Sequence, residues 1–305
     1  MSFEDNIIIL IVMLIYGVTS GGSAIILKKG IYKAGGIKLD NFFQDVLPTA
    51  WNLLTTPMWF LGGIAALTGF LIYTIALNTY DVSIVKPLIN TNLLFTFVFA
   101  AIYFKERLSV VEWFGVGVLI LGLVLFAFSP NLESTSDMNI LILLGFLPIT
   151  LSLIGLMLLL LFVLKRTGSA EFVFPLIAGI FFGLGTFFTK SLLIGLNGSL
   201  QTVLPDNLLV IYSLVMLIIT YGFATVAQQL AFERGRLSIV TPITNAVSIT
   251  ISFIGAYFVF YEELITPLEG TLSFQSFFKP IGLVCIILAL VLLRREINPK
   301  IDLST

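Results

Sequence analysis

Long stretches without charge dominate this chain and limit what it can fold into. A helix that crosses the roughly 30 Å hydrocarbon core of a bilayer needs about 20 mostly apolar residues. Nine runs meet this condition: 7–27, 58–77, 82–104, 110–128, 139–164, 172–195, 207–232, 238–261 and 277–293. The sequence therefore predicts an all-α polytopic membrane protein with about nine transmembrane helices.

The composition excludes several classes of protein. Only 11% of the 305 residues are charged, against about 25% in an ordinary soluble domain. The 16 basic and 17 acidic residues nearly balance, so nucleic acid is not an expected partner. The chain has no histidine and one cysteine, which removes His-based catalytic pairs and disulfides. We expect neither enzyme activity nor a cofactor.

One segment, 39–57, can be interpreted in two ways. It contains two aspartates, two asparagines, a glutamine and a central proline, all of which make crossing a bilayer costly. Its apolar residues recur near helical spacing, as they do in a helix that lies in the membrane interface. We expect an interfacial helix here, and a tenth span is the alternative.

The basic residues favour nine spans. With the N-terminus outside, 13 of the 16 Lys and Arg residues fall in cytoplasmic segments, while Lys279 alone falls in an outer loop. This asymmetry follows the positive-inside rule. A tenth span would divide the basic residues between the two sides. We therefore predict an integral protein of the cell membrane with its N-terminus outside and its C-terminus in the cytoplasm.

Two copies of one motif, SIVKPLIN and SIVTPITN, lie 155 residues apart. The offset pairs three polar or helix-bending residues of each copy: Ser83 with Ser238, Pro87 with Pro242, and Asn90 with Asn245. A weaker offset of 162 residues pairs Gly17 and Gly21 with Gly179 and Gly183. The chain therefore contains an internal repeat, and the two GxxxG spacings predict close helix packing in each copy.

The repeat divides the chain into four parts. An odd number of predicted spans lies between equivalent helices, so the second copy is inverted in the membrane. The parts are a first repeat at 1–130, a linking helix at 131–168, a second, inverted repeat at 169–296 and a cytoplasmic tail at 297–305. Inverted repeats are typical of secondary transporters, whose substrate site lies near the midplane between the halves.

Polar residues within the spans are the candidate substrate pathway. Proline frees a backbone carbonyl, and the Ser and Asn residues four before and three after it share its helix face. These residues could line a pathway, or they could bend the helices and bind neighbouring ones. The pathway candidates are Ser83, Pro87, Asn90, Ser238, Pro242, Asn245, Lys190, Thr189 and Lys86. We identify no metal ligands.

The two lysines within spans need separate explanations. A lysine at the centre of a span costs about 2.5–3.5 kcal/mol on insertion scales. An anionic substrate, a partner carboxylate or a gate would account for Lys190, and so would a side chain that extends to the outer surface. For Lys86, which is closer to the outer end, we favour the extended side chain. Gln228 and Gln229 could line the pathway or bond between helices, and we favour the second interpretation.

The repeated motifs resemble the drug/metabolite transporter superfamily with EamA-like repeats. The similar features are a glycine in the first helix, an Ala–Ser–Pro helix pair and a closing Glu-Arg-Leu. In this sequence they are Gly17, Ala76, Ser83, Pro87 and Glu106-Arg107-Leu108, and then Ala231, Ser238, Pro242 and Glu262-Glu263-Leu264. The second copy departs from the pattern at Glu263. Within the superfamily, three segments are similar to the NIPA-type magnesium transporters: GGSAIILKKG (21–30), FFTKSL (187–192) and SIVTPI (238–243).

The resemblance implies a secondary transporter that works by alternating access, with Mg²⁺ as its substrate. The residues themselves do not select magnesium, because no acidic residue lies deep in a span and a buried lysine would repel a dication. Export or exchange of a small polar or anionic organic metabolite is the alternative, and a scaffold without transport is the least expected. The expected partners are the bilayer, a small-molecule or ion substrate, and, as an open possibility, a second copy of the chain.

Overall fold

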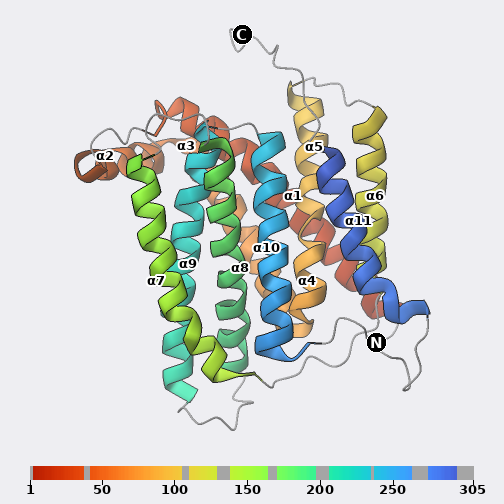
Figure 1. Ribbon diagram of the computed structural model, residues 1–305. Coiled ribbons are helices and arrows are strands. Elements are labelled where there is room, and N and C mark those ends of the chain that lie inside the picture. Colours follow the sequence, from red (N-terminus) through yellow and green to blue (C-terminus); the bar gives the residue numbers. More distant parts are fainter. Residues whose placement is uncertain are drawn as a thin grey trace.

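The computed structural model describes residues 3–37, 42–104, 110–128, 138–163, 170–196, 206–234, 237–262 and 274–293 (Figure 1). All regular elements in these ranges are helices, so the predicted all-α class is confirmed for them. They are α1 (Phe3–Lys33), α2 (Phe42–Thr55), α3 (Pro57–Thr79), α4 (Val82–Leu88), α5 (Thr91–Phe104), α6 (Val110–Ala127), α7 (Ile140–Val163), α8 (Ala170–Leu196), α9 (Asp206–Arg234), α10 (Leu237–Phe260), the short 3₁₀ helix η2 (Phe274–Phe277) and α11 (Phe278–Leu293).

The long helices present apolar side chains outward, as a lipid-facing bundle requires. Leu61, Ile75 and Leu141 are 59%, 67% and 81% exposed. Five helical segments in the described ranges are long and apolar enough to cross a membrane: Ile7–Lys33, Pro57–Thr79, Val173–Leu196, Leu208–Glu233 and Val240–Phe260. Three shorter apolar segments, Trp113–Leu125, Leu141–Met157 and Phe278–Ala289, accompany them. The chain is therefore a polytopic membrane protein, while the count of nine spans stays a prediction.

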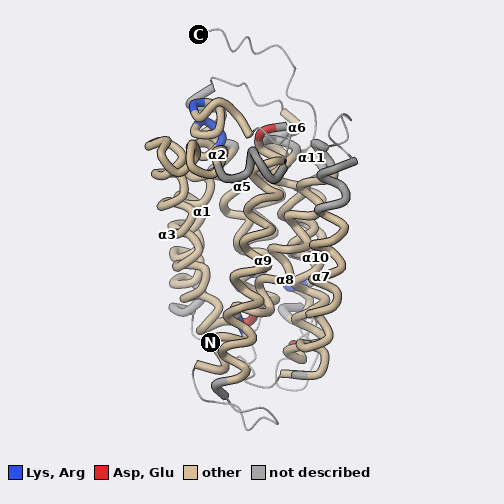
Figure 2. The backbone as a smooth tube through the Cα atoms, turned by 90° about the vertical axis from the view of Figure 1, so that its left-hand side faces the viewer, with Lys and Arg blue, Asp and Glu red and all other residues tan. Residues whose placement is uncertain are grey.

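The bundle has two distinct ends. Helix α1 begins at the end where α3 and α10 finish, which is the bottom of Figure 1, and α11 finishes at the opposite end. We call these the outer and inner ends, after the orientation predicted from the basic residues. In Figure 2 the described charged residues gather toward the two ends, and the middle of the bundle is mostly uncharged.

Helix α2, in the ambiguous segment 39–57, lies crosswise at the inner end (Figure 1). Leu53 packs into a cluster with Ile31, Phe174 and Leu230, while Trp51 on the other side of α2 is 69% exposed. Leu53 thus attaches the helix to the bundle, while Trp51 remains free to face a membrane surface. The interfacial position itself stays a prediction.

Equivalent helices of the two copies have equivalent neighbours. In the first copy α1 packs against α3 and α5, and in the second copy α8 packs against α9 and α10. The last helices of the copies, α6 and α11, pack against each other. The division of the sequence into two repeats stays a prediction, and α7 occupies the predicted linking helix.

The four glycines predicted to allow close packing lie at these helix contacts. A Cβ atom on Gly21 would lie 2.6 Å from the Asn92 carbonyl oxygen of α5. A Cβ on Gly179 would lie 2.6 Å from the Thr244 carbonyl oxygen of α10. Gly17 and Gly183 are equally crowded by the same partner helices. Glycine therefore lets α1 approach α5, and α8 approach α10, at backbone-to-backbone distance.

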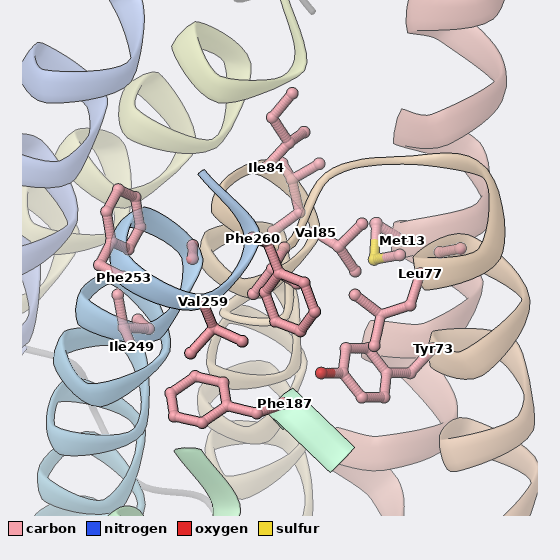
Figure 3. Packing of buried hydrophobic residues seen from close by; sticks show 14 of the residues in the cluster. Met13, Tyr73, Leu77, Ile84, Val85, Phe187, Ile249, Phe253, Val259 and Phe260 are labelled. Carbon is pink, nitrogen blue, oxygen red and sulfur yellow. The ribbon is translucent and has the colours of Figure 1, made fainter. Parts of the chain in front are cut away.

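An apolar core joins the two halves toward the outer end. Figure 3 shows side chains of both halves converging there, among them Leu77 and Val85 from the first copy and Val259 and Phe260 from the second. These four side chains are fully buried in one cluster. The core closes the bundle on the outer side of the cavity described next.

Candidate functional site

A cavity of about 440 Å³ lies between the two copies. Helices α1, α3, α4, α8, α9 and α10 supply its walls, together with Asn90 and Asn92 at the start of α5. It extends from Lys86 and Tyr73 on the outer side toward Trp59 and Phe232 on the inner side. A cavity of this volume is in the range of small-ligand sites. No Asp or Glu is among the described residues that line it.

Lys86 supplies the one formal charge of the described cavity wall. Its side chain is 5% exposed, and its Nζ donates to Thr186 Oγ1 at 2.8 Å and to the Phe182 carbonyl at 3.5 Å. The Tyr73 ring lies 5.5 Å from the same Nζ, within cation–π range. None of these partners is an anion, so the ammonium charge is solvated by dipoles but not neutralised.

Thr186 holds Lys86 in place. Its Oγ1 accepts from Lys86 and, at 3.0 Å, from the Tyr73 hydroxyl, and it donates to the Phe182 carbonyl at 3.0 Å. The three side chains come from α4, α8 and α3. The lysine is therefore fixed by both copies at once, and movement of one copy against the other would change its environment.

The asparagines of the two motifs meet at the cavity wall. Asn245 Nδ2 donates to Asn90 Oδ1 at 3.2 Å and to Asn92 Oδ1 at 3.0 Å. Asn90 Nδ2 in turn donates to the Pro87 carbonyl at 2.8 Å, which also accepts from the backbone N–H of Asn90 at 3.0 Å. A polar bridge between the copies thus lies where the helix pair α4–α5 is broken. Broken helices at mid-depth are a common way to build transporter sites.

Helix α10 lines the cavity with a polar stripe. Thr241, Thr244, Asn245 and Ser248 recur at the spacing of one helix face. The hydroxyl oxygens of Thr241, Thr244 and Ser248 are buried and have no hydrogen-bond partner in the described structure. The indole Nε1 of Trp59 and the Oε1 of Gln229 are also buried without a hydrogen-bond partner in the described structure. Buried polar atoms without partners are costly, so these five atoms are suited to a polar ligand.

The predicted Ser–Pro–Asn stripe holds only in part. Asn90 and Asn245 line the cavity, whereas Ser83, Pro87 and Pro242 are buried outside its wall. The prediction assumed one continuous helix through each motif. In the first copy, the chain turns at residues 89–90 between α4 and α5, so Ser83 and Asn90 no longer share a face. The side chain of Ser238 lies outside the described residues.

Lys190 and Thr189 do not line the cavity either. Lys190 is buried at the outer end, where its Nζ donates to the carbonyls of Leu77 at 2.9 Å and Tyr80 at 3.2 Å. Thr189 donates to the carbonyl of Gly185 in its own helix. One explanation offered for Lys190, that its side chain extends to the outer surface, is therefore wrong. The lysine instead joins the end of α3 to α8.

Glu262 makes a second connection between the copies at the outer end. Its carboxylate accepts from the backbone N–H groups of Val82 at 2.9 Å and Ser83 at 2.7 Å, and so caps α4 from the end of α10. Burial raises the pKa of the neighbouring Asp81 to about 7; the charge of Glu262 adds to the shift, while Lys279 and Lys190 oppose it. Charged groups thus gather at the outer end, from Asp81 between α3 and α4, Lys190 of α8, Glu262 after α10 and Lys279 of α11.

Two expectations about side chains are corrected. Lys86 does not extend to the outer surface, because the Thr186 hydroxyl and the Phe182 carbonyl bind its ammonium group inside the bundle. Gln228 and Gln229 both line the cavity, as the alternative interpretation predicted, and the Oε1 atom of Gln229 has no hydrogen-bond partner in the described structure.

Several cavity residues were not singled out from the sequence. Thr186 and Asn92 gave no signal beyond being polar within an apolar run. Helical periodicity could have predicted the stripe at Thr241, Thr244 and Ser248. Thr241 and Thr244 each precede by one residue a motif position, Pro242 or Asn245, that was singled out from the sequence. Among the described residues, no group of three or more His, Cys, Asp or Glu side chains could hold a metal ion.

Comparisons with known proteins identify one part of the chain. Residues 39–128, which comprise α2 to α6 and the links between them, match the EamA-like transporter family. This part of the chain is EamA-like. The expected resemblance to the drug/metabolite transporter superfamily is therefore supported in the first copy. No solved structure matches the chain.

The curated relatives are short proteins. One is the probable 4-amino-4-deoxy-L-arabinose-phosphoundecaprenol flippase subunit ArnE of Aeromonas hydrophila, 33% identical over 76 residues, or 25% of this chain and 66% of the relative. The protein of the same name in Aeromonas salmonicida is 29% identical over the same shares. The chain thus spans just under two thirds of the length of these relatives. Neither is a magnesium transporter, and the NIPA-type branch finds no support.

Proposed function

We propose that the chain is a secondary transporter of the EamA type which carries a small organic anion, with the cavity as its central binding site. The observation that carries the proposal is the buried ammonium of Lys86, which faces the cavity without an anionic partner among its contacts. A charge held at such a site is expected to bind an opposite charge that arrives and leaves.

The remaining wall fits an organic solute better than a metal ion. Aromatic rings and partnerless hydroxyl and amide groups surround Lys86, and no described carboxylate joins them. Mg²⁺ prefers carboxylate and phosphate oxygens, and a lysine would repel it. We therefore replace the magnesium expectation with the organic alternative. The substrate in the relatives' name also carries an anionic group, a phosphate.

The two-copy arrangement supports alternating access. The apolar core, Lys190 and Glu262 close the outer end through contacts between copies. The asparagine bridge and Lys86 lie where the copies meet near mid-depth. Rocking of one copy against the other would open the outer contacts and expose the same site to the other side.

Reconstituted liposomes test the proposal. We expect uptake of a small anion such as glycerol 3-phosphate or glucuronate, little uptake of neutral mannitol, and no Mg²⁺ flux. Lys86→Met removes the charge and is expected to lower anion uptake by about tenfold or more, as loss of about 1.4 kcal/mol of binding would do. The matched control is Lys33→Met, which changes an exposed lysine at the inner end of α1.

Three results would contradict the proposal. One is Mg²⁺ flux that survives in Lys86→Met. Another is equal uptake of mannitol and the anions. The third is the absence of binding and uptake for both anions by a folded wild-type protein.

A further inference from the structure

Two walls of the cavity reach the surface of the bundle at mid-depth. Leu67 of α3 and Thr225 of α9 both line the cavity, yet Leu67 is 58% exposed and Thr225 is exposed as well. Helix α3 packs on α1, and α9 packs on α8, but α3 and α9 hardly pack on each other. The space between them is therefore a lateral opening of the cavity, which we call the α3–α9 portal.

The portal has a closed outer edge and an apolar side. The rings of Phe70 on α3 and Tyr221 on α9 meet edge-on at 5.0 Å and close it toward the outer end. From Phe70 toward the inner end, α3 presents Leu67, Ala66 and Gly63 to the cavity at the spacing of one helix face.

Gly63 marks free space beside the portal. A Cβ atom there would meet no other atom within 4 Å, whereas one on the adjacent Gly62 would lie 2.9 Å from Leu27. The chain therefore leaves room on the side of α3 that faces the cavity, and does not fill that room with a side chain of its own.

The surroundings outside the portal are apolar. On α3 the neighbouring outward residues Ile64 and Leu71 are 47% and 54% exposed. Both lie within a segment long and apolar enough to span a bilayer, so acyl chains, and not water, would face the opening at this depth. A ligand that occupies both cavity and portal would need a polar head and an apolar chain.

We propose that the cavity and the α3–α9 portal together bind a lipid-linked anion, with the head group at Lys86 and the alkyl chain passing between α3 and α9 into the bilayer. This inference rests on the proposed function and specifies its substrate class. It accounts for a site that is cationic and hydroxyl-lined at one side and apolar and open to lipid at the other.

Paired probes with the same head group test the portal. Glycerol 3-phosphate and 1-oleoyl lysophosphatidate differ by one acyl chain, so their comparison isolates the portal. Binding is measured on the full chain in phosphatidylcholine nanodiscs, as the ligand concentration that gives half of the maximal rise in melting temperature. Oleoyl lysophosphatidylcholine, which has the chain without a net negative head, is the control for non-specific lipid effects.

We expect wild-type protein to bind lysophosphatidate about tenfold or more tightly than glycerol 3-phosphate, because burial of even a few methylene groups gives that factor. Gly63→Leu places a larger side chain where an added Cβ atom meets nothing within 4 Å. It is expected to weaken binding of lysophosphatidate more than binding of glycerol 3-phosphate, so that the advantage is lost. Gly155→Leu, at an exposed glycine of α7 where a Cβ atom would also meet nothing within 4 Å, should leave both probes unaffected.

The outcomes separate the two proposals. Equal binding of both probes, or an unchanged advantage of lysophosphatidate in Gly63→Leu, would overturn the portal and leave the anion site intact. Binding of neither probe by wild-type protein would overturn the anion site itself. A change of oligomeric mass in Gly63→Leu would instead assign the α3–α9 surface to a second copy of the chain and would also overturn the portal.

Discussion

At the scale of single residues, the cavity wall is built for a ligand at some cost to stability. Thr244 shows this most directly, because its hydroxyl oxygen is buried with no partner. Thr250, on the same helix, is exposed and donates to the Ala246 carbonyl at 2.9 Å. Thr244 therefore has a hydroxyl that is available to a ligand, whereas the hydroxyl of Thr250 is bound within its own helix.

We predict opposite effects of Thr244→Val on stability and on binding. Removing a partnerless buried hydroxyl should leave the free energy of unfolding unchanged or raise it by about 1 kcal/mol. Binding of the anion should weaken, because a ligand loses one hydrogen-bond partner. Thermal unfolding and ligand titration measure the two quantities, and Thr250→Val is the control. Tighter binding in Thr244→Val would contradict the assignment.

Asp81 gives a prediction for pH. Because its pKa is raised to about 7 by burial and by Glu262, against the opposing Lys279 and Lys190, the folded state binds a proton that the unfolded state has already lost above about pH 4. Through this group, stability therefore falls as pH rises from about 4 to about 7. Asp81→Asn should flatten the dependence of melting temperature on pH in that interval. If the melting temperature of Asp81→Asn depended on pH as steeply as that of the wild type, the pH dependence would come from another titratable group.

At the scale of elements, one motif gives two different structures. SIVKPLIN forms most of α4 and a turn at residues 89–90, after which α5 begins. SIVTPITN instead lies within the single helix α10, which continues through Pro242. Glu262, at the end of α10, supplies the cap that fixes the start of α4. The separation of α4 from α5 is thus supported by a contact from the other copy, which no local pattern in the first copy could reveal.

Glycine substitutions test the helix contacts. In Gly179→Ala the new Cβ would lie 2.6 Å from a backbone oxygen of α10, so α8 and α10 must separate, and we expect a loss of about 1–3 kcal/mol in stability. In Gly155→Ala the Cβ meets nothing within 4 Å, and the better helix propensity of Ala should be neutral or add about 0.5–1 kcal/mol. Chemical unfolding of both variants measures the difference. Equal stability of the two would refute the close contact.

At the scale of the whole molecule, the distribution of lysine and arginine predicts the orientation in the membrane. Helix α1 starts at one end of the bundle and α11 finishes at the other (Figure 1), as an odd number of crossings requires. The basic residues predict that the second of these ends lies in the cytoplasm.

Cysteine labelling tests the orientation. With the single native cysteine removed by Cys285→Ala, Ser134→Cys should react with an impermeant maleimide added outside intact cells, because the segment before α7 is predicted to be an outer loop. Lys33→Cys, at the inner end of α1, is the matched control and should react only after permeabilisation. The reverse pattern would invert the topology.

The sequence by itself determined the class of protein and contains the repeated motif, and it predicts the side of the membrane on which the basic residues lie. These follow from composition and periodicity, since backbone polar groups in lipid are satisfied only in helices or closed barrels, and apolar runs of about 20 residues have the length of helices. The paired offsets of Gly17 with Gly179 and of Asn90 with Asn245 were readable because each copy repeats its local pattern.

Only the tertiary structure decided which polar residues face the cavity. Lys86 and Lys190 look alike in sequence, each a lysine within an apolar run, yet Lys86 faces the cavity and Lys190 joins helices at the outer end. The difference depends on which oxygens of the other copy come within reach of each ammonium group. Contacts between segments more than a hundred residues apart set that geometry, and periodicity along one helix cannot predict it.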